Sequence, residues 1–128
     1  MSHTVKIKVQ YKVSEAGQLE KAFKTLGWGF VENASAREYS GRSSTYPYVA
    51  VNPEKVGNAY DIGIKSEGGN LGLFTDMWGG SVERGLGKGF SKLNQEFAAA
   101  VIENEYPNAN ISRSTDEKGN LILDVEQW

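Results

Sequence analysis

The stretch from Tyr60 to Trp78, YDIGIKSEGGNLGLFTDMW, has two short runs of alternating apolar and polar residues on either side of the turn sequence EGGN (67–70). Alternation with a period of two is typical of a strand with one buried face, and two glycines between such runs favour a tight hairpin turn. The sequence therefore predicts a β-hairpin. With Gly68 and Gly69 in the turn, the predicted cross-strand pairs are Glu67 with Asn70, Lys65 with Gly72, Gly63 with Phe74 and Asp61 with Asp76.

This register assigns the side chains of the hairpin to two faces. The core-facing set is Tyr60, Ile62, Ile64, Leu71, Leu73 and Met77. The outward set is Asp61, Gly63, Lys65, Gly72, Phe74, Asp76 and Trp78. Two aspartates directly opposite each other are unusual, because like charges at a cross-strand pair repel. We therefore take Asp61, Phe74, Asp76 and Trp78 as the candidate site.

Length and composition indicate one ordinary folded domain over residues 1–128. A chain of 128 residues can bury a single hydrophobic core without disulfide or metal cross-links. Hydrophobic residues make up 39% and charged residues 23% of the chain, which is typical of a globular protein and not of a disordered one. The net charge of -2 argues against a dedicated nucleic-acid binder, which normally carries a basic stripe.

Cysteine and histidine content exclude several kinds of site. The chain has no cysteine, which excludes disulfides, thiolate catalysis, Cys-based zinc sites and iron–sulfur clusters. Its one histidine, His3, lies at the N-terminus, so we expect neither a His-rich metal site nor a Ser-His-Asp triad. We predict no cofactor, no metal ligands and no catalytic residues. No run of about 18 apolar residues is present. We therefore expect a cytoplasmic location, or an equivalent reducing compartment such as the plastid stroma or the cytoplasm of a phage host.

The N-terminal third predicts a strand, a helix and a second strand. Residues 4–13 alternate cleanly, with Val5, Ile7, Val9, Tyr11 and Val13 on the inner face. Ser14 is placed to cap a helix over residues 15–26, and Gly27 is placed to end it. Residues 28–33 follow as a short strand. This order predicts a right-handed crossover between two parallel strands of one sheet.

The segments on either side of the hairpin are rich in turn residues. Within residues 34–59, the stretch 39–46 has the Ser and Gly content of a loop, and 46–51 predicts a strand that Pro47 places near a sheet edge. The glycine-rich stretch 79–89 predicts a flexible connection. It does not match the phosphate-binding pattern, because Leu86 occupies the position where that pattern requires lysine.

The remaining chain predicts a second helix and two closing strands. The helix runs over residues 90–105, with the buried stripe Phe90, Leu93, Phe97, Ala100 and Val101. The strands cover 110–114 and 120–127, with Leu121, Leu123 and Val125 facing inward, and we expect Trp128 to pack over the core edge. Together the elements predict an α+β fold with a mostly antiparallel sheet and two helices on one face, loosely ferredoxin-like.

Five short motifs occur in a characteristic order along the chain. They are Met1-Ser2-His3, Tyr60-Asp61-Ile62-Gly63, Asp76-Met77-Trp78-Gly79, Leu93-Asn94-Gln95 and the C-terminal Asp124-Val125-Glu126-Gln127-Trp128. In this combination the chain resembles the hypothetical chloroplast reading frame thirty-five family, domain of unknown function twelve fifty-seven, which has cyanobacterial, plastid and phage members. The glycine-rich stretch 79–89 is longer here than in the family, so no role is carried over to it. The resemblance implies no catalytic residues. Because family members tend to be encoded near an AAA-type ATPase, it implies an accessory or adaptor role.

Three interpretations of the aspartate pair remain open. In the first, the register differs by a residue, or Lys65 or Arg84 neutralises the pair. In the second, the two carboxylates and Trp78 form a polar and aromatic patch that receives a lysine or arginine of a partner. In the third, the carboxylates bind Mg²⁺ or Ca²⁺ or share a proton for acid–base chemistry.

We favour a non-enzymatic adaptor that binds a protein partner through Asp61, Phe74, Asp76 and Trp78. The alternative is a small metal-dependent hydrolase or transferase that uses the paired aspartates. A weak nucleic-acid binder is the third hypothesis, and it requires Lys6, Lys8, Lys12 and Arg42 to converge on one face.

Overall fold

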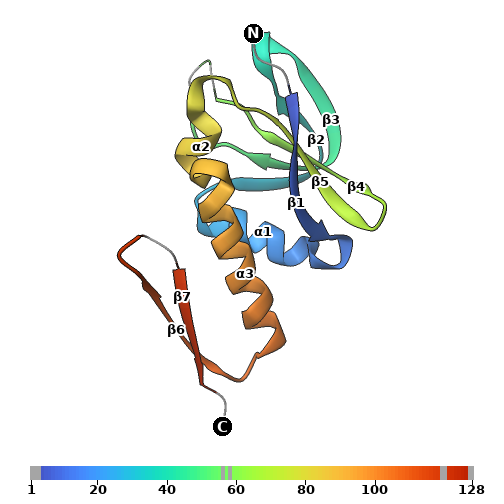
Figure 1. The fold of residues 1–128 in the computed structure, drawn as a ribbon. Coiled ribbons are helices and arrows are strands. Elements are labelled where there is room, and N and C mark those ends of the chain that lie inside the picture. Colours follow the sequence, from blue (N-terminus) through green and yellow to red (C-terminus); the bar gives the residue numbers. More distant parts are fainter. Residues whose placement is uncertain (1–3, 56, 58, 119–120, 127–128) are drawn as a thin grey trace.

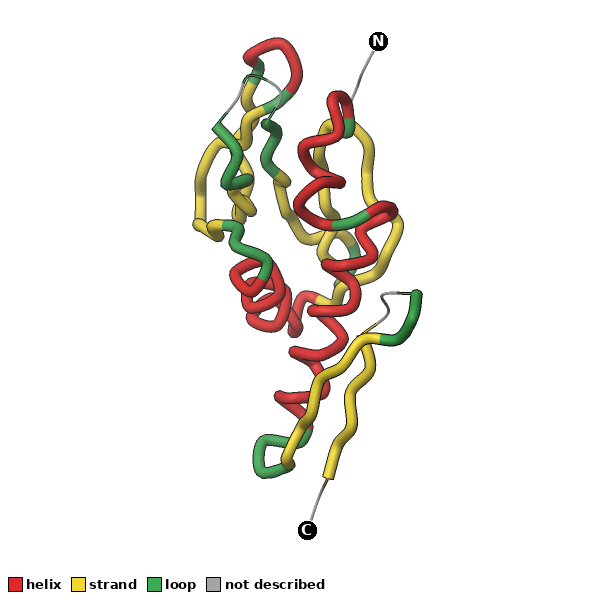
Figure 2. Tube along the Cα trace, turned by 90° about the vertical axis from the view of Figure 1, so that its left-hand side faces the viewer, coloured by secondary structure: helices red, strands yellow, loops and turns green. Residues whose placement is uncertain are grey.

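The computed structural model describes residues 4–55, 57, 59–118 and 121–126, and it forms an α+β fold (Figures 1 and 2). The strands are β1 (Thr4–Lys12), β2 (Gly29–Arg37), β3 (Ser43–Val51), β4 (Ile62–Glu67), β5 (Asn70–Asp76), β6 (Asn110–Thr115) and β7 (Leu121–Glu126). The α-helices are α1 (Ala16–Thr25), α2 (Ser81–Leu86) and α3 (Ser91–Glu105). Single 3-10 turns are η1 (Val13–Glu15), η2 (Tyr39–Gly41), η3 (Trp78–Gly80) and η4 (Lys88–Phe90).

Five strands form one antiparallel sheet in the order β1-β5-β4-β3-β2, and β6 pairs with β7 in a separate two-stranded sheet. In the core, alternate residues of β4 and β5 pack against the apolar faces of the helices. Its fully buried side chains include Ile62, Ile64 and Leu73 from the sheet, and Leu19 and Leu93 from α1 and α3. Both long helices therefore cover one face of the sheet, which confirms the predicted fold class.

The central hairpin has the predicted register over most of its length. Glu67 pairs with Asn70, Lys65 with Gly72, and Gly63 with Phe74. The predicted pair of Asp61 with Asp76 is wrong. Asp61 precedes β4 and donates its backbone N–H to the Arg37 carbonyl at 3.1 Å, whereas Asp76 lies opposite Thr4 in the β1–β5 ladder. The predicted core face of the hairpin is confirmed: Tyr60, Ile62, Ile64, Leu71 and Leu73 are buried, and Met77 packs partly against them.

The first strand and helix form as predicted, with two corrections at their junction. Tyr11 is buried, but Val13 is 44% exposed, because the chain leaves the strand at Lys12 and turns through η1. Ser14 is therefore inside η1 and does not cap α1, whose N-cap is Glu15 and has no side-chain cap. Gly27 ends the helix as predicted, with a φ of 86° that favours glycine. Side chains of β1 before Tyr11 lie outside the described residues.

Strands β1 and β2 lie at opposite edges of the sheet. All four ladders between them are antiparallel, so the two edge strands run in the same direction, as the sequence predicted. Helix α1 connects them on the core face, and the meander from β2 to β5 fills the three places between.

The predicted loop over residues 39–46 is wrong in part, because β3 already begins at Ser43, and β2 extends beyond its predicted end to Arg37. β2 and β3 pair from Gly29 with Val51 to Arg37 with Ser43. β3 is also not an edge strand, because residues Tyr48–Ala50 pair with β4. Pro47 directly precedes this doubly paired part, so its missing N–H leaves the β4 ladder intact.

The far half of the β2–β3 hairpin curves over the outward face of β4 and β5 (Figure 1). A Cβ on Gly63 would lie 2.3 Å from the Tyr46 ring, so this ring needs a glycine beneath it. The Tyr46 ring also stacks on Phe74, with 6.1 Å between the ring centroids. The outward face of the central hairpin is therefore partly covered by β3.

The glycine-rich stretch 79–89 is not a plain flexible connection, because it contains the short helix α2. Val82 and Leu86 of this helix are buried in the core. Gly85 lies against the Trp28 indole, and a Cβ at this position would come within 2.6 Å of Nε1. Glycine here serves close packing of the helix and not loop freedom alone.

Helix α3 follows the prediction closely, but the strands after it do not join the main sheet. Phe90, Leu93 and Ala100 are buried, and Phe97 and Val101 are half-buried. We call β6 and β7 the C-terminal arm, and it extends beside α3 away from the five-stranded sheet (Figures 1 and 2). Val125, predicted to face inward, is 38% exposed, while Leu123 is half-buried. The Leu121 side chain and Trp128 lie outside the described residues.

Candidate functional site

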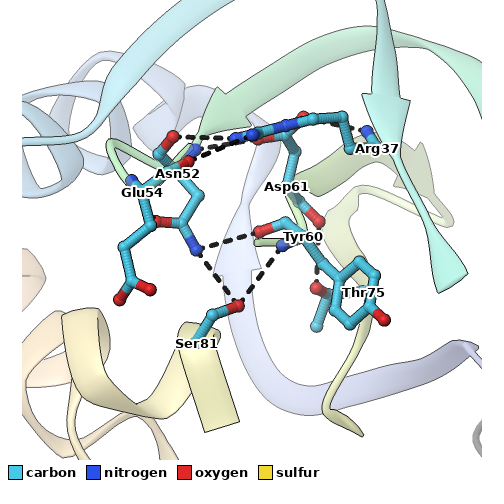
Figure 3. Close-up of polar contacts among 7 residues, drawn as sticks. All are labelled: Arg37, Asn52, Glu54, Tyr60, Asp61, Thr75 and Ser81. Atoms are coloured by element: carbon cyan, nitrogen blue, oxygen red, sulfur yellow. Dashed lines mark hydrogen bonds and ion pairs between the residues drawn. The ribbon is translucent and has the colours of Figure 1, made fainter. Parts of the chain in front are cut away.

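The Asp61 carboxylate is the centre of a buried polar network (Figure 3). Its Oδ2 accepts hydrogen bonds from the Arg37 backbone N–H at 2.8 Å and from Arg37 Nε at 3.0 Å. Its Oδ1 accepts from Arg37 Nη2 at 2.8 Å and from the Asn52 backbone N–H at 2.9 Å. A carboxylate has about four lone-pair positions. Asp61 therefore has no acceptor capacity left for a ligand or a metal ion.

Arg37, at the end of β2, holds the loop between β3 and β4 by hydrogen bonds. Besides Asp61, its guanidinium donates to the backbone carbonyl of Asn52 at 2.8 Å and to that of Glu54 at 3.1 Å. The hydrogen bond to Asp61 raises the pKa of Arg37. A planar guanidinium suits such multiple donation, and lysine could not replace it.

Asn52 and Ser81 extend the network from this loop to α2 (Figure 3). The Asn52 amide Nδ2 donates to the Tyr60 carbonyl at 3.2 Å and to Ser81 Oγ at 3.4 Å. The backbone N–H of Tyr60 also donates to Ser81 Oγ, at 3.3 Å. Thr75 Oγ1 closes the network by donating to the Asp61 carbonyl at 2.9 Å. These contacts fix the start of β4 against α2 and β5, so the network holds the fold together.

Asp76, the other predicted aspartate, has a different environment. It is also buried, at 1% exposure, and its Oδ1 accepts the backbone N–H of Trp78 at 3.0 Å. Its Oδ2 accepts no hydrogen bond from the part of the chain that the structure describes. The pKa of Tyr60 is raised by burial and, to a smaller extent, by the charge of Asp76 and by Tyr39. Asp76 therefore lies close to Tyr60.

Trp78 presents the largest exposed aromatic surface of this region. Its side chain is 47% exposed, on the turn η3 between β5 and α2. The hydrogen bond to Asp76 fixes its backbone, and the Tyr39 ring meets the indole edge-on with 5.8 Å between ring centroids. We call Tyr39, Asp76 and Trp78 the aromatic-acidic surface.

Phe74 does not belong to this surface. It is half-buried, stacked on Tyr46, and the Lys65 ammonium lies 4.8 Å above its ring centroid. The four predicted site residues therefore separate. Asp61 is a fully bonded structural group, Phe74 supports β3, and Asp76 and Trp78 remain together.

The first interpretation of the aspartates named the wrong neutralising cations. Lys65 lies over Phe74, and Arg84 pairs with Glu54 at 2.8 Å, while Arg37 neutralises Asp61. Sequence reasoning missed Arg37, Asn52, Ser81 and Tyr39. The Asn52-Pro53 turn was visible in the sequence, but the pairing of Arg37 with Asp61 depends on the curved β2–β3 hairpin and left no local signal.

Three further features bear on ligand binding: a groove, the basic residues and the acidic residues. A groove of about 460 Å³ lies between α1 and α3, lined among others by Gly17, Lys21, Ala100 and Glu103. Lys12 and Arg42, named for nucleic-acid binding, are exposed, and the side chains of Lys6 and Lys8 lie outside the described residues. Within the described residues, no three His, Asp or Glu side chains are grouped so that they could hold a metal ion.

Comparison with protein-family models, curated proteins and solved structures finds no significant match to this chain. Among the helices of the described chain, none is both long enough and apolar enough to cross a membrane.

Proposed function

We propose that the protein is a non-enzymatic accessory module that binds a protein partner through the aromatic-acidic surface. One observation carries this proposal: an exposed tryptophan is held in place by its backbone bond to Asp76 and by its contact with Tyr39. Tryptophan and tyrosine are the residues most enriched in binding hot spots, and a side chain that is already held loses little entropy on binding.

The sequence resemblance supports the same class of function. The motif Asp76-Met77-Trp78-Gly79 that carries part of the resemblance includes both the buried aspartate and the exposed indole. The family association with an AAA-type ATPase makes such an ATPase the first partner to test. We do not propose the paired-aspartate enzyme, because the four hydrogen bonds to Asp61 occupy the lone pairs that a metal or a proton would need.

The proposal is tested by quantitative pull-down with mass spectrometry, comparing the wild-type chain with Trp78→Ala and Tyr39→Ala. We expect a stoichiometric partner that is lost with Trp78→Ala and weakened with Tyr39→Ala. Val31→Ala is the matched control, because Val31 is a similarly exposed apolar residue, at 43%, on the edge strand β2. Capture that persists in Trp78→Ala, or that Val31→Ala reduces equally, would contradict the proposal.

A further inference from the structure

The unpartnered oxygen of Asp76 calls for an explanation that the fold itself does not supply. The Asp76 side chain is buried, and its Oδ2 accepts no hydrogen bond within the described residues. Burying a charged acceptor without a donor costs stability, and such groups are rare in native proteins. The neighbouring Asp61 is fully satisfied, so this region of the fold does supply donors where a carboxylate is structural.

The surroundings of Asp76 are suited to a cation. Trp78 and Tyr39 form an edge-to-face pair at the surface. The pKa of Tyr60 is raised by burial and, to a smaller extent, by the charge of Asp76 nearby. Aromatic ring faces attract cations, most strongly those of tryptophan. Two nearby arginines are already engaged: Arg37 binds Asp61, and Arg84 binds Glu54.

We propose that the aromatic-acidic surface receives the ammonium group of a lysine side chain on the protein partner. The ammonium donates a hydrogen bond to Asp76 Oδ2 and lies against the rings of Trp78 and Tyr39. This inference rests on the proposed function, and it adds the chemistry by which the partner is recognised.

The occupied oxygen of Asp76 favours lysine over arginine. Among the described residues, Oδ2 accepts no hydrogen bond and Oδ1 accepts one, from the Trp78 backbone N–H, so a bidentate guanidinium would have to share Oδ1 with this N–H. A guanidinium gains most from two parallel hydrogen bonds to both oxygens of a carboxylate, whereas an ammonium is a compact charge that needs only one. A divalent cation would find the carboxylate of Asp76 in no group of three acidic or histidine side chains within the described residues, which is fewer ligands than Mg²⁺ or Ca²⁺ requires.

Access to Asp76 depends on the turn that carries Trp78. Trp78 is followed by Gly79 and Gly80, whose φ angles are 81° and 77°. Because Asp76 Oδ2 is buried, binding of the ammonium requires a movement of this turn, and glycine adopts the φ region of Gly79 and Gly80 without strain.

The binding test follows the indole N–H signal of Trp78 by NMR in the full ¹⁵N-labelled chain, assigned with Trp78→Phe. The probe is Nα-acetyl-lysine methylamide, with the norleucine and arginine analogues as comparators. We expect a saturable shift with the lysine analogue, roughly tenfold weaker binding of the arginine analogue and no saturable shift with norleucine. Asp76→Asn should abolish the response. Asp124→Asn, an exposed carboxylate on the C-terminal arm, should leave it unchanged.

Thermal unfolding of Asp76→Asn gives a second, independent readout. The amide keeps an oxygen for the Trp78 N–H and removes an unpaired buried charge, so we expect an equal or higher melting temperature. A clearly lowered melting temperature would show that the carboxylate is a structural acceptor and would overturn the inference. Absence of a saturable shift with the lysine analogue would overturn it as well.

The pull-down separates this inference from the proposed function. A partner lost with Trp78→Ala but fully retained with Asp76→Asn would leave the adaptor role standing and overturn the lysine site. Loss with both variants, while Asp76→Asn remains folded, supports the two together.

Discussion

Asp61 and Asp76 show how far the role of a residue depends on distant parts of the chain. Both are buried aspartates at the ends of neighbouring strands, and sequence alone paired them. Arg37, 24 positions before Asp61, satisfies one carboxylate completely. Among the described residues, Asp76 receives a donor only from its own turn. The structural aspartate and the candidate binding aspartate can therefore be told apart by counting donors.

Asp61→Asn is expected to destabilise the fold strongly. An amide would place a donor where Arg37 and Asn52 now donate, and it would leave the arginine charge uncompensated. We expect a loss of about 2–3 kcal/mol in the free energy of unfolding, since a charged hydrogen-bonded group is removed from a buried network. Urea unfolding measures this loss.

The matched control for Asp61→Asn is Asp124→Asn, which removes an exposed charge on β7 and should change the free energy of unfolding by less than about 0.5 kcal/mol. If Asp61→Asn were equally neutral, the network around Arg37 would not contribute to stability as argued. The Asp61→Asn variant is also unsuited to testing partner binding, because loss of the fold would mimic loss of the surface.

At the scale of elements, two arginines hold the loop between β3 and β4. Arg37 binds it from β2, and Arg84 binds Glu54 from α2, with Nη2 to Oε1 at 2.8 Å and Nε to Oε2 at 3.1 Å. Because Arg84 also donates to the Gly79 carbonyl, this contact connects the loop to the turn that presents Trp78.

The Glu54–Arg84 pair should give a stability contribution that depends on pH. Its hydrogen bond from Arg84 lowers the pKa of Glu54 below the unfolded value. A lowered folded pKa contributes stability above the unfolded pKa, which for glutamate is about 4.3, and this stability is lost as the pH falls through the folded pKa. We expect Glu54→Gln to be less stable than wild type at pH 7. At a pH below the folded pKa of Glu54, we expect the two proteins to be equally stable.

Urea unfolding of wild type and Glu54→Gln between pH 7 and pH 3 measures the effect. Glu117→Gln is a suitable control, because Glu117 lies in the exposed β6–β7 turn, far along the chain from Arg84. A difference between wild type and Glu54→Gln that did not shrink with acidification would show that the pair acts through packing and not through charge.

Elements set by local patterns were predictable, and those set by tertiary contacts were not. The central hairpin follows from alternation around Gly68-Gly69, and α1 and α3 follow from their apolar spacing. α2 was missed because Gly85 within it lowers helix propensity and the flanking glycines favour a loop, while burial of Val82 and Leu86 stabilises it. Strand β3 was assigned only from Tyr46, because its Ser-rich first half is held by pairing with β2.

The candidate site was predictable in part for the same reason. The exposure of Trp78 and its closeness to Asp76 follow from the turn after β5, which is local. The burial of Asp61 and the covering of Phe74 follow from the curved β2–β3 hairpin. Residue propensities do not predict such curvature. Tyr39 reaches Trp78 only through that curvature.

At the scale of the whole molecule, the core and the C-terminal arm are distinct. Among the side chains that the structure describes, every member of the core cluster lies between Tyr11 and Phe97. Arg113 of the arm pairs with Glu96 and approaches Glu103 at 3.9 Å, both on α3. A lone two-stranded hairpin is marginally stable in water, so the arm depends on α3 for its order.

We therefore expect a chain shortened to residues 1–106 to fold by itself. It keeps the five-stranded sheet, all three α-helices and every described member of the core cluster, and it loses the arm with the partly exposed Arg113–Glu96 pair. The expected loss is about 1–2 kcal/mol in the free energy of unfolding, from one well-formed ion pair and the partial burial of Ile111 and Leu123. Guanidinium unfolding measures it, and ¹H–¹⁵N spectra should show unchanged signals for the sheet. Arg113→Gln in the full chain separates the ion pair from the apolar contacts, and an unfolded 1–106 chain would make the arm part of the folding unit.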